Sequence, residues 1–507
     1  MKKLFSVLVI AILFFSIIFG YEVKAQENYK RIYVYSNGFS SEIPYNFVVD
    51  ESLDNIVTKL YTQDGTKIHI YNQPVDNVGV QTYIKYSNKQ INLGKGGVSL
   101  INKEKVKFEN GATAYIYEYK RPIQKNISND KNYYYEINEV YPKDKRVITF
   151  WLKTDEANFE YYKGVLNHIA KTTWQMEEHN DPYHPPYKTR SINIKGDKTT
   201  IDIPKDKMLW GIFHPHKLDK GNYVDEVSDI EQKLDWKFEF LMTYSDFRNN
   251  IPVEGVKNAY NDGRVMMLTM QPWFYGDRDS NIIIPQIING EYDEYIKKWA
   301  RDVKDIKEPI FIRFANEMNG DWDPWCAWFF AKDTDLYIEA WKRVYNIFKE
   351  EGANNALFVF NPHDRSYPNF KWNNAHLYYP GDEYVDWVGL TGYNNGTSFK
   401  GDVWREFDEI YYNNYNEYMK YYSNKPFMIT EFSCNEVGGD KANWIREGFK
   451  KFVNMPNIKM AVWFDQVDML WEYNIDSSPE AMDAFKESLR NPHFSTDSVS
   501  ISQEINY

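Results

Sequence analysis

The first part of the chain alternates apolar and polar positions in short runs. This period-2 pattern predicts half-buried strands, and its clearest examples are Lys67–Tyr71, Ala112–Tyr119, Tyr133–Tyr141 and Val147–Leu152. Apolar residues at helical spacing follow between Phe159 and Ile169 and predict an amphipathic helix. We therefore expect a small α+β domain over residues 26–176, an antiparallel sheet backed by a helix.

The hydrophobic pattern changes after residue 200. Continuous apolar runs begin near Leu209, Phe238, Val265, Ile310, Ala356, Trp387, Phe427 and Met460. Helical stretches lie between most of them, and the clearest covers Asp335–Glu350 with Gly352 just past its end. Runs that are apolar on both faces and alternate with helices indicate buried parallel strands. Eight of them predict an α/β fold, a (β/α)8 TIM-like barrel over residues 201–491. A doubly wound open sheet is the alternative.

Two polar segments flank the predicted barrel. Residues 177–190 are polar and contain three prolines, a composition that predicts a stiff interdomain linker, which we assign to residues 177–200. Residues 492–507 are polar and rich in serine, and we predict a disordered tail there. The first domain is then expected to be a separable accessory module.

The N-terminus has the pattern of a secretory signal peptide. Met1-Lys2-Lys3 is basic, an apolar run reaches Phe19, and small residues precede a predicted cut after Ala25. The apolar run is shorter than the roughly 20 residues of a membrane span, although an uncleaved N-terminal anchor is the alternative. We expect residues 1–25 to be removed and the protein to be secreted.

Charge and composition narrow the classes of partner. The formal net charge of −12 argues against nucleic acid and anionic membranes as partners. Cys326 and Cys434 are the only cysteines, so they form one disulfide or stay free thiols. Aromatic residues make up 17% of the chain. Such a content is compatible with a sugar-binding protein, because flat aromatic side chains stack on sugar rings.

Functional groups of such a barrel gather at the C-terminal ends of its strands. The predicted strand ends carry His214, Tyr244, Trp273, Asn316, Glu317, His363, Tyr393, Asn394, Glu431, Asp465 and Gln466. The two unpaired acids that end an apolar run most abruptly are Glu317, on the fourth strand, and Glu431, on the seventh. These strands face each other across the barrel, so both carboxylates could flank one bond. Surface or ion-paired glutamates are the alternative.

A pair of carboxyl groups about 5–5.5 Å apart performs retaining glycoside hydrolysis. One acts as the nucleophile and forms a glycosyl-enzyme. The other protonates the leaving oxygen and then deprotonates water, so its surroundings must keep it protonated near neutrality.

The same residues resemble glycoside hydrolase family 26, a clan A family of β-mannanase-like and β-glucanase-like enzymes. The motif on the fourth strand comprises Arg313, Asn316, Glu317, Asn319, Gly320, Trp322 and Trp325. The stretch Ile429–Phe432 resembles the family's nucleophile motif, and Tyr379–Asn394 is similar to its segment into strand six. The resemblance covers roughly residues 205 to 490 and leaves the first domain out.

The resemblance implies a role for each matching residue. Glu317 would be the general acid/base and Glu431 the nucleophile. Tyr393 would donate a hydrogen bond to the nucleophile, Arg313 would support it from below, and Trp463 would form the floor of the subsite that holds the cleaved sugar. A place in the barrel core is the alternative for Trp463.

Further substrate contacts are expected around this pair. Gly320 and the Asp323-Pro324 step favour a loop, where Trp322 and Trp325 would form a stacking platform; a helical core stripe is the alternative. His214 and Trp273 are candidate sugar contacts at other strand ends. No ligand spacing such as HExxH occurs, so we expect neither a catalytic metal nor a cofactor.

Asn316 departs from the pattern of the family's mannanases, which usually have histidine just before the acid. Asparagine is usual in the wider clan, where it contacts the sugar 2-hydroxyl. That hydroxyl is axial in mannose and equatorial in glucose, so Asn316 argues against mannan specificity.

From the residues and the resemblance together, we expect a secreted, monomeric, retaining endo-β-glycan hydrolase that acts on a β-linked polysaccharide. Mannan, mixed-linkage glucan, xylan and a self-made exopolysaccharide stay open as substrates. The first domain would contact a glycan or the cell surface. Two other classes are the alternatives: a catalytically inactive carbohydrate-binding barrel, and a zinc hydrolase on the same type of barrel.

Overall fold

The computed structural model describes most of the chain. The described residues are 28–53, 55–108, 111–141, 143–179, 192–195, 199–214, 223–274, 282–494 and 500–503. The predicted signal peptide (residues 1–25) and residues 180–191 of the predicted linker lie outside them. Within the described ranges, no helix is both long and apolar enough to cross a bilayer.

Eight parallel strands close into a barrel in chain order, which confirms the predicted fold class. They are β13 (Leu209–Phe213), β14 (Phe240–Asp246), β15 (Val265–Gln271), β16 (Ile310–Phe314), β17 (Ala356–Phe360), β18 (Trp387–Asn394), β19 (Phe427–Cys434) and β20 (Ile458–Phe464). Every residue of β16, β19 and β20 is buried. These strands are covered by helices outside and by side chains inside, which is why their sequences are apolar on both faces.

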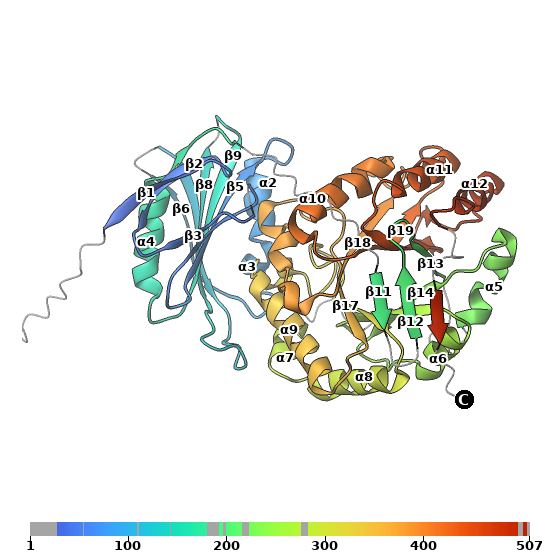
Figure 1. Ribbon diagram of the computed structural model, residues 1–507. Helices are drawn as coiled ribbons and strands as arrows, with labels where there is room; N and C mark the ends of the chain where they lie inside the picture. The colour runs from blue at the N-terminus through green and yellow to red at the C-terminus, as the bar shows by residue number, and fades with distance from the viewer. Residues whose placement is uncertain are drawn as a thin grey trace, which may run out of the picture.

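Helices surround the barrel (Figure 1). They are α5 (Tyr223–Leu234), α6 (Val253–Asn261), α7 (Ile283–Ile288), α8 (Asp293–Ile306), α9 (Thr334–Glu350), α10 (Asn413–Tyr422), α11 (Lys441–Phe452) and α12 (Pro479–Leu489). Short 3-10 and π turns lie between them: η1 (Ala327–Phe330), η2 (Lys371–Asn373), η3 (Ala375–Tyr378), η4 (Asp382–Tyr384) and η5 (Asp408–Tyr412). After β20, the hairpin of β21 (Val467–Asp468) and β22 (Trp471–Glu472) precedes α12.

The N-terminal domain is α+β, as predicted. A seven-stranded antiparallel sheet has the order β3-β4-β5-β9-β8-β7-β6, and a smaller sheet has the order β1-β2-β10. The strands are β1 (Tyr29–Val34), β2 (Phe39–Pro44), β3 (Val48–Asp50), β4 (Thr58–Tyr61), β5 (Lys67–Pro74), β6 (Ser99–Lys107), β7 (Thr113–Lys120), β8 (Tyr133–Tyr141), β9 (Arg146–Thr154) and β10 (Trp174–Gln175). The helices are α2 (Val80–Ser87), α3 (Lys89–Leu93) and α4 (Phe159–Lys171).

A third small sheet corrects the predicted linker and tail. Strands β11 (Ile192–Lys195), β12 (Thr199–Ile203) and β23 (Ser500–Gln503) pair antiparallel. Part of the predicted linker and part of the predicted disordered tail are therefore strands. Each polar segment finds its hydrogen-bond partners in the other, about 300 residues away, and local composition carries no signal of such pairing.

The two faces of the seven-stranded sheet have different partners. One face carries aliphatic residues such as Ile70, which pack against residues of α4 such as Leu166. Together they form a hydrophobic core that is separate from the core of the barrel. The opposite face is aromatic: Tyr119 stacks on Tyr134 with ring centroids 4.9 Å apart and accepts a hydrogen bond from Trp151 Nε1 at 2.8 Å. These rings belong to one hydrophobic core that continues into the barrel. In Figure 1, α2 and α3 lie on the side of the sheet domain that faces the barrel.

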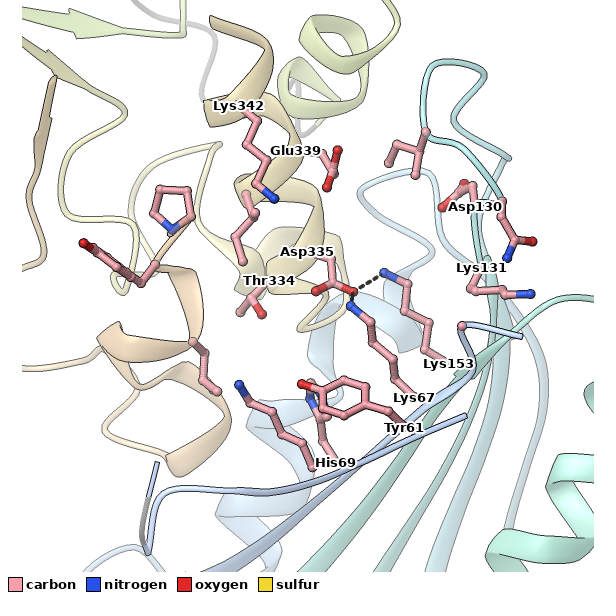
Figure 2. A pocket seen from close by; sticks show the side chains of 18 of the residues that line it. Tyr61, Lys67, His69, Asp130, Lys131, Lys153, Thr334, Asp335, Glu339 and Lys342 are labelled. Atoms are coloured by element: carbon pink, nitrogen blue, oxygen red, sulfur yellow. Dashed lines mark hydrogen bonds and ion pairs between the residues drawn. The ribbon is translucent and has the colours of Figure 1, made fainter. Parts of the chain in front are cut away.

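Buried charges also join the two domains. Lys153 Nζ on β9 lies 2.7 Å from Asp333 Oδ1 and 2.7 Å from Asp335 Oδ2, both at the start of α9. Figure 2 shows Lys67 and Lys153 meeting at Asp335. Asp333 is fully buried and also accepts a hydrogen bond from Tyr134 Oη at 2.6 Å. Such an interface argues against the freely separable first domain that the linker suggested.

We expect Asp333→Ala to destabilise the folded chain by about 3–5 kcal/mol, because it leaves buried Lys153 with one counter-charge fewer. Equilibrium urea unfolding followed by tryptophan fluorescence measures the loss. The control is Glu447→Ala, which removes the exposed partner of Lys450 and should cost less than about 1 kcal/mol. Similar losses in the two variants would contradict a buried, energetically coupled interface.

Candidate active site

Glu317 lies just past the end of β16, in a backbone conformation that side chains rarely adopt. Its φ is 56° and that of Ala315 is 45°. Both values lie in the left-handed region, where the backbone conformation is energetically unfavourable for residues other than glycine. The turn is held because Glu317 N donates to Asn361 O at 2.7 Å and Gly320 N donates to Glu317 O at 2.9 Å. Strain of this kind is typical of functional sites, where a side chain must point in a direction that regular backbone does not give.

Glu431 lies within β19, opposite Thr391 of β18, and is only 3% exposed. One guanidinium nitrogen, Nη2 of Arg313, lies 2.5 Å from Glu431 Oε1 and 3.8 Å from Glu317 Oε1. The two carboxyl oxygens can therefore be no farther apart than the sum of these distances. That sum is below the roughly 6.5–9.5 Å between the carboxyl groups of inverting glycosidases.

Arg313 is completely buried in the barrel and is fixed by neighbouring strands. Its Nε donates to Asn361 Oδ1, and Nη2 donates to Thr391 Oγ1 at 2.8 Å. The guanidinium carbon lies 5.9 Å from the centroid of the Tyr244 ring on β14. With its donors occupied, the cation holds one orientation beneath both glutamates.

The two carboxyl groups are electrostatically unequal. Burial raises the pKa of Glu317 well above its usual range, and the nearby Glu431 raises it further, while Arg313 lowers it. A protonated Glu317 can donate a proton at neutral pH. The guanidinium lies closer to Glu431 and offsets a negative charge there.

Tyr244 belongs to the same charge cluster. Burial raises the pKa of its hydroxyl well above the usual value, with Glu431 as the second cause. The hydroxyl therefore stays protonated and can donate a hydrogen bond to an acceptor beside it.

Ligand-binding clefts typically measure about 300–1,000 Å³, and a cleft of about 680 Å³ opens beside Glu317. Its aromatic lining residues are Trp322, Tyr367, Tyr393, Trp471 and Tyr473. Its charged lining residues besides Glu317 are Asp321, Arg365, Asp402, Arg405 and Asp468. Aromatic faces interspersed with hydrogen-bonding groups fit a sugar chain better than a compact apolar ligand.

Two of the predicted aromatic contacts lie in this cleft. The Trp322 ring packs 5.3 Å from both the His363 and the Tyr367 rings. A Cβ on Gly320 would lie 2.7 Å from this indole, so the ring folds over a glycine. Tyr393 lines the same cleft and stacks on Tyr473 with ring centroids 5.1 Å apart.

Trp325 and Trp463 do not lie in the cleft, contrary to the prediction. Trp325 is fully buried and donates from Nε1 to Asn316 O at 2.7 Å, so it supports the turn from beneath. Trp463 is also fully buried and packs outward, 5.1 Å from Phe485 of α12. Successive strand residues point to opposite faces, and it is the next residue, Phe464, that packs against Tyr393.

The remaining predicted contacts lie around the barrel mouth. Asn316 is 3% exposed, and its Oδ1 accepts a hydrogen bond from Gln271 Nε2 at 3.3 Å. His214 Nδ1 lies 2.7 Å from Asp465 Oδ2. Trp273 packs against Trp325 with centroids 6.4 Å apart. The segments that follow His214 and Trp273 in the chain lie outside the described residues, and neither side chain lines the cleft around Glu317.

Several cleft residues were missed from the sequence. Trp471 and Tyr473 follow the last strand, where their rings stack 6.3 Å apart, and Arg405 joins the cleft through an ion pair with Asp364. The alternation of Trp471 and Tyr473 was a usable signal of an aromatic hairpin. The Arg405–Asp364 pair joins residues 41 apart and has no local signature.

Part of this chain is similar to known glycoside hydrolases. Residues 281–461 match the sequence profile described as Glycosyl hydrolase family 26. The chain is 35% identical over 262 residues to Endoglucanase H of Acetivibrio thermocellus, a match that covers 51% of this chain and 28% of that protein. It is 31% identical over 122 residues to a mannan endo-1,4-beta-mannosidase of Bacillus subtilis, covering 22% of this chain and 32% of that one. The chain thus spans less than a third of these relatives.

A solved GH26 beta-mannanase from Bacteroides ovatus shares 17% sequence identity with this chain, with a TM-score of 0.44. The alignment covers 57% of this chain and 90% of that one.

We expect the Glu317 carboxyl group to titrate at a lower pH in Glu431→Gln than in the parent. The substitution removes the like charge that raises the pKa of Glu317 and leaves Arg313, which lowers it. Carbon-13 NMR of glutamate side chains follows the titration, with Glu317→Gln assigning the signal. Glu447→Gln, on the surface, is the control and should leave the titration unchanged. An unchanged or higher value in Glu431→Gln would show that the two groups are not coupled.

Proposed function

Because residues 281–461 carry a glycosyl hydrolase family 26 domain, we propose that this chain is a retaining endo-β-glycan hydrolase. The observation that carries the proposal is the contact of Glu317 and Glu431 with one nitrogen of Arg313, which places the two carboxyl groups close enough to flank one glycosidic bond. Relatives named as an endoglucanase and as mannan endo-β-mannosidases support endo action.

The proposed mechanism is a double displacement. Glu431 attacks the anomeric carbon and forms a covalent glycosyl-enzyme, while protonated Glu317 donates its proton to the leaving glycosidic oxygen. Once Glu431 is esterified, its charge no longer raises the pKa of Glu317. Glu317 then becomes a better base for the water that hydrolyses the intermediate.

Arg313 and Tyr244 position the nucleophile in this scheme. The ion pair at 2.5 Å fixes the Glu431 carboxylate, and hydrogen bonds to Asn361 and Thr391 keep the guanidinium from following the substrate. Tyr244 supplies a protonated hydroxyl from β14. The role first assigned to Tyr393, a hydrogen bond to the nucleophile, remains part of the proposal.

Asn316 is proposed to contact the sugar 2-hydroxyl. Gln271 occupies its amide oxygen, so the amide NH2 is the group available to donate. An equatorial 2-hydroxyl, as in glucose or xylose, would meet this donor, and we propose a gluco- or xylo-configured β-glycan as the substrate. The match to Endoglucanase H over half of this chain supports that choice. Mannan and a self-made exopolysaccharide are the other candidates.

An inactive carbohydrate-binding barrel is less well supported. A barrel that only binds sugars has no need for a protonated acid next to an ion-paired carboxylate. We also propose that the protein is secreted through its N-terminal signal sequence and acts as a monomer.

The two glutamates should differ in their dependence on the leaving group. We expect Glu317→Ala to keep the first step on an activated aryl glycoside, which needs no proton, and to lose hydrolysis of the polymer. Glu431→Ala should lose several orders of magnitude in kcat on both substrates, because nothing replaces the nucleophile. Steady-state kinetics on an aryl glycoside and a β-glucan measure the contrast.

Azide is the control for this pair. It should partly restore Glu431→Ala and yield the inverted glycosyl azide, because the small anion fills the space of the missing carboxylate. Equal losses on both substrates in Glu317→Ala, or Glu431→Ala within tenfold of the parent, would contradict the assigned roles.

We expect a greater kcat/KM on β-1,4-glucan or xylan than on linear mannan. The bond from Asn316 to the 2-hydroxyl strengthens in the transition state, so Asn316→Ala should lower kcat more than it raises KM. Side-by-side kinetics on the three polymers test this. A clear preference for mannan would overturn the 2-hydroxyl contact and leave the two-glutamate mechanism standing.

A further inference from the structure

The segment that follows Glu317 touches the N-terminal domain at several points. This segment, residues 318–333, is called the Glu317 loop below. It runs from the proposed acid to the start of α9 and includes the short turn η1. Asp321 and Trp322 of this loop line the cleft together with Glu317.

Helix α2 of the N-terminal domain meets the loop close to the cleft. Tyr86 Oη donates a hydrogen bond to Asp321 Oδ2. The Tyr86 ring stacks on Trp328 with centroids 5.3 Å apart and planes 23° apart, and Trp328 Nε1 donates back to Tyr86 O at 3.3 Å. One tyrosine therefore holds the loop by its hydroxyl, its ring and its carbonyl.

The far part of the loop is held by separate contacts. A Cβ on Gly96 would lie 2.1 Å from Phe329 O, so the two backbones approach as closely as a glycine allows. Lys332 Nζ lies 2.5 Å from Glu136 Oε2 and donates to Asn88 Oδ1 at 2.9 Å, and all three residues are buried. These contacts keep the domain docked when the Tyr86 hydroxyl alone is removed.

We propose that Tyr86 is a positioning residue for the cleft, acting through Asp321 to hold the Trp322 ring where a sugar would stack. The inference rests on the proposed glycan hydrolase function. It gives the N-terminal domain a part in substrate binding at the catalytic cleft, in place of an accessory role at a distance.

The physical reason lies in how the Asp321 side chain and the neighbouring Trp322 ring are held. Asp321 and Trp322 are half-buried, and Gly320 before them has no side chain to pack. The hydrogen bond from Tyr86 fixes the Asp321 side chain, and the adjacent indole then lies against His363 and Tyr367. Glu317 and Glu431 are anchored separately by Asn361 and Arg313, so the loss of Tyr86 Oη should affect sugar binding more than chemistry.

The test is a double-mutant cycle of Tyr86→Phe and Asp321→Ala, which removes the acceptor of the Tyr86 hydrogen bond. We expect Tyr86→Phe to raise KM on β-glucan about threefold to tenfold with kcat within about twofold of the parent, because binding is lost without loss of transition-state chemistry. If Tyr86 acts through Asp321, the double variant should resemble Asp321→Ala alone. Tyr45→Phe, at an exposed tyrosine of the same domain, is the matched control and should match the parent.

Two further readouts separate positioning from general stability. Titration calorimetry with cellohexaose in the Glu431→Ala background should show the same loss of affinity for Tyr86→Phe; mannohexaose replaces it if the parent prefers mannan. Amide hydrogen exchange should become faster in residues 318–331 and stay unchanged in β5 and β9, while the unfolding midpoint stays at the parent value. Tyr86→Phe retains the ring that stacks on Trp328, so it should fold.

The outcomes distinguish this inference from the proposed function. Additive effects of the two substitutions on KM, or hydrogen exchange in the loop equal to that of the parent, would overturn the role of Tyr86. If the parent neither binds nor hydrolyses glycans, the proposed function fails. Hydrogen exchange still reports whether Tyr86 orders the loop, but the inference about sugar binding then falls with the function.

Discussion

A single buried cation sets the chemistry that this barrel can perform. A guanidinium without water is tolerated only when its donors find acceptors, and Arg313 finds them in Asn361, Thr391 and Glu431. Because it lies closer to Glu431 than to Glu317, it offsets charge at one carboxyl group and leaves the other to burial and like-charge repulsion. In the proposed mechanism, the division between an ion-paired nucleophile and a protonated acid thus follows from where one side chain lies.

The strained turn that carries the acid depends on contacts well beyond the barrel strands. The positive φ of Glu317 would be unstable in isolation, and it is held from the side by the Asn361 carbonyl and from beneath by Trp325. The Glu317 loop is then clamped by the N-terminal domain through Tyr86 and Lys332. The two domains thus pack against each other at this loop, and the aromatic face of the seven-stranded sheet continues into the hydrophobic core of the barrel.

Two tryptophans show how position in the fold overrides residue type. Trp322 and Trp325 lie three residues apart, yet one lines the cleft and the other is fully buried beneath the turn. Trp463 lies one residue before the end of β20 and packs toward α12. The cleft receives an aromatic lining residue from Trp471 on the following hairpin instead. An aromatic side chain near an active site can stack on a sugar or pack into the protein core. The direction in which the side chain points decides between these two roles.

The sequence by itself determined the barrel, the α+β domain and the candidate pair of glutamates. Continuous apolar runs report burial on both faces, and the strand ends of a parallel barrel converge at one mouth, so Glu317 and Glu431 could be found from spacing alone. Tertiary structure decided the rest: the pairing of β12 with β23, the outward direction of Trp463 and the contact of Tyr86 with Asp321, which are 235 residues apart. Local periodicity encodes which face of an element is buried, but it carries no information on which distant segment covers that face.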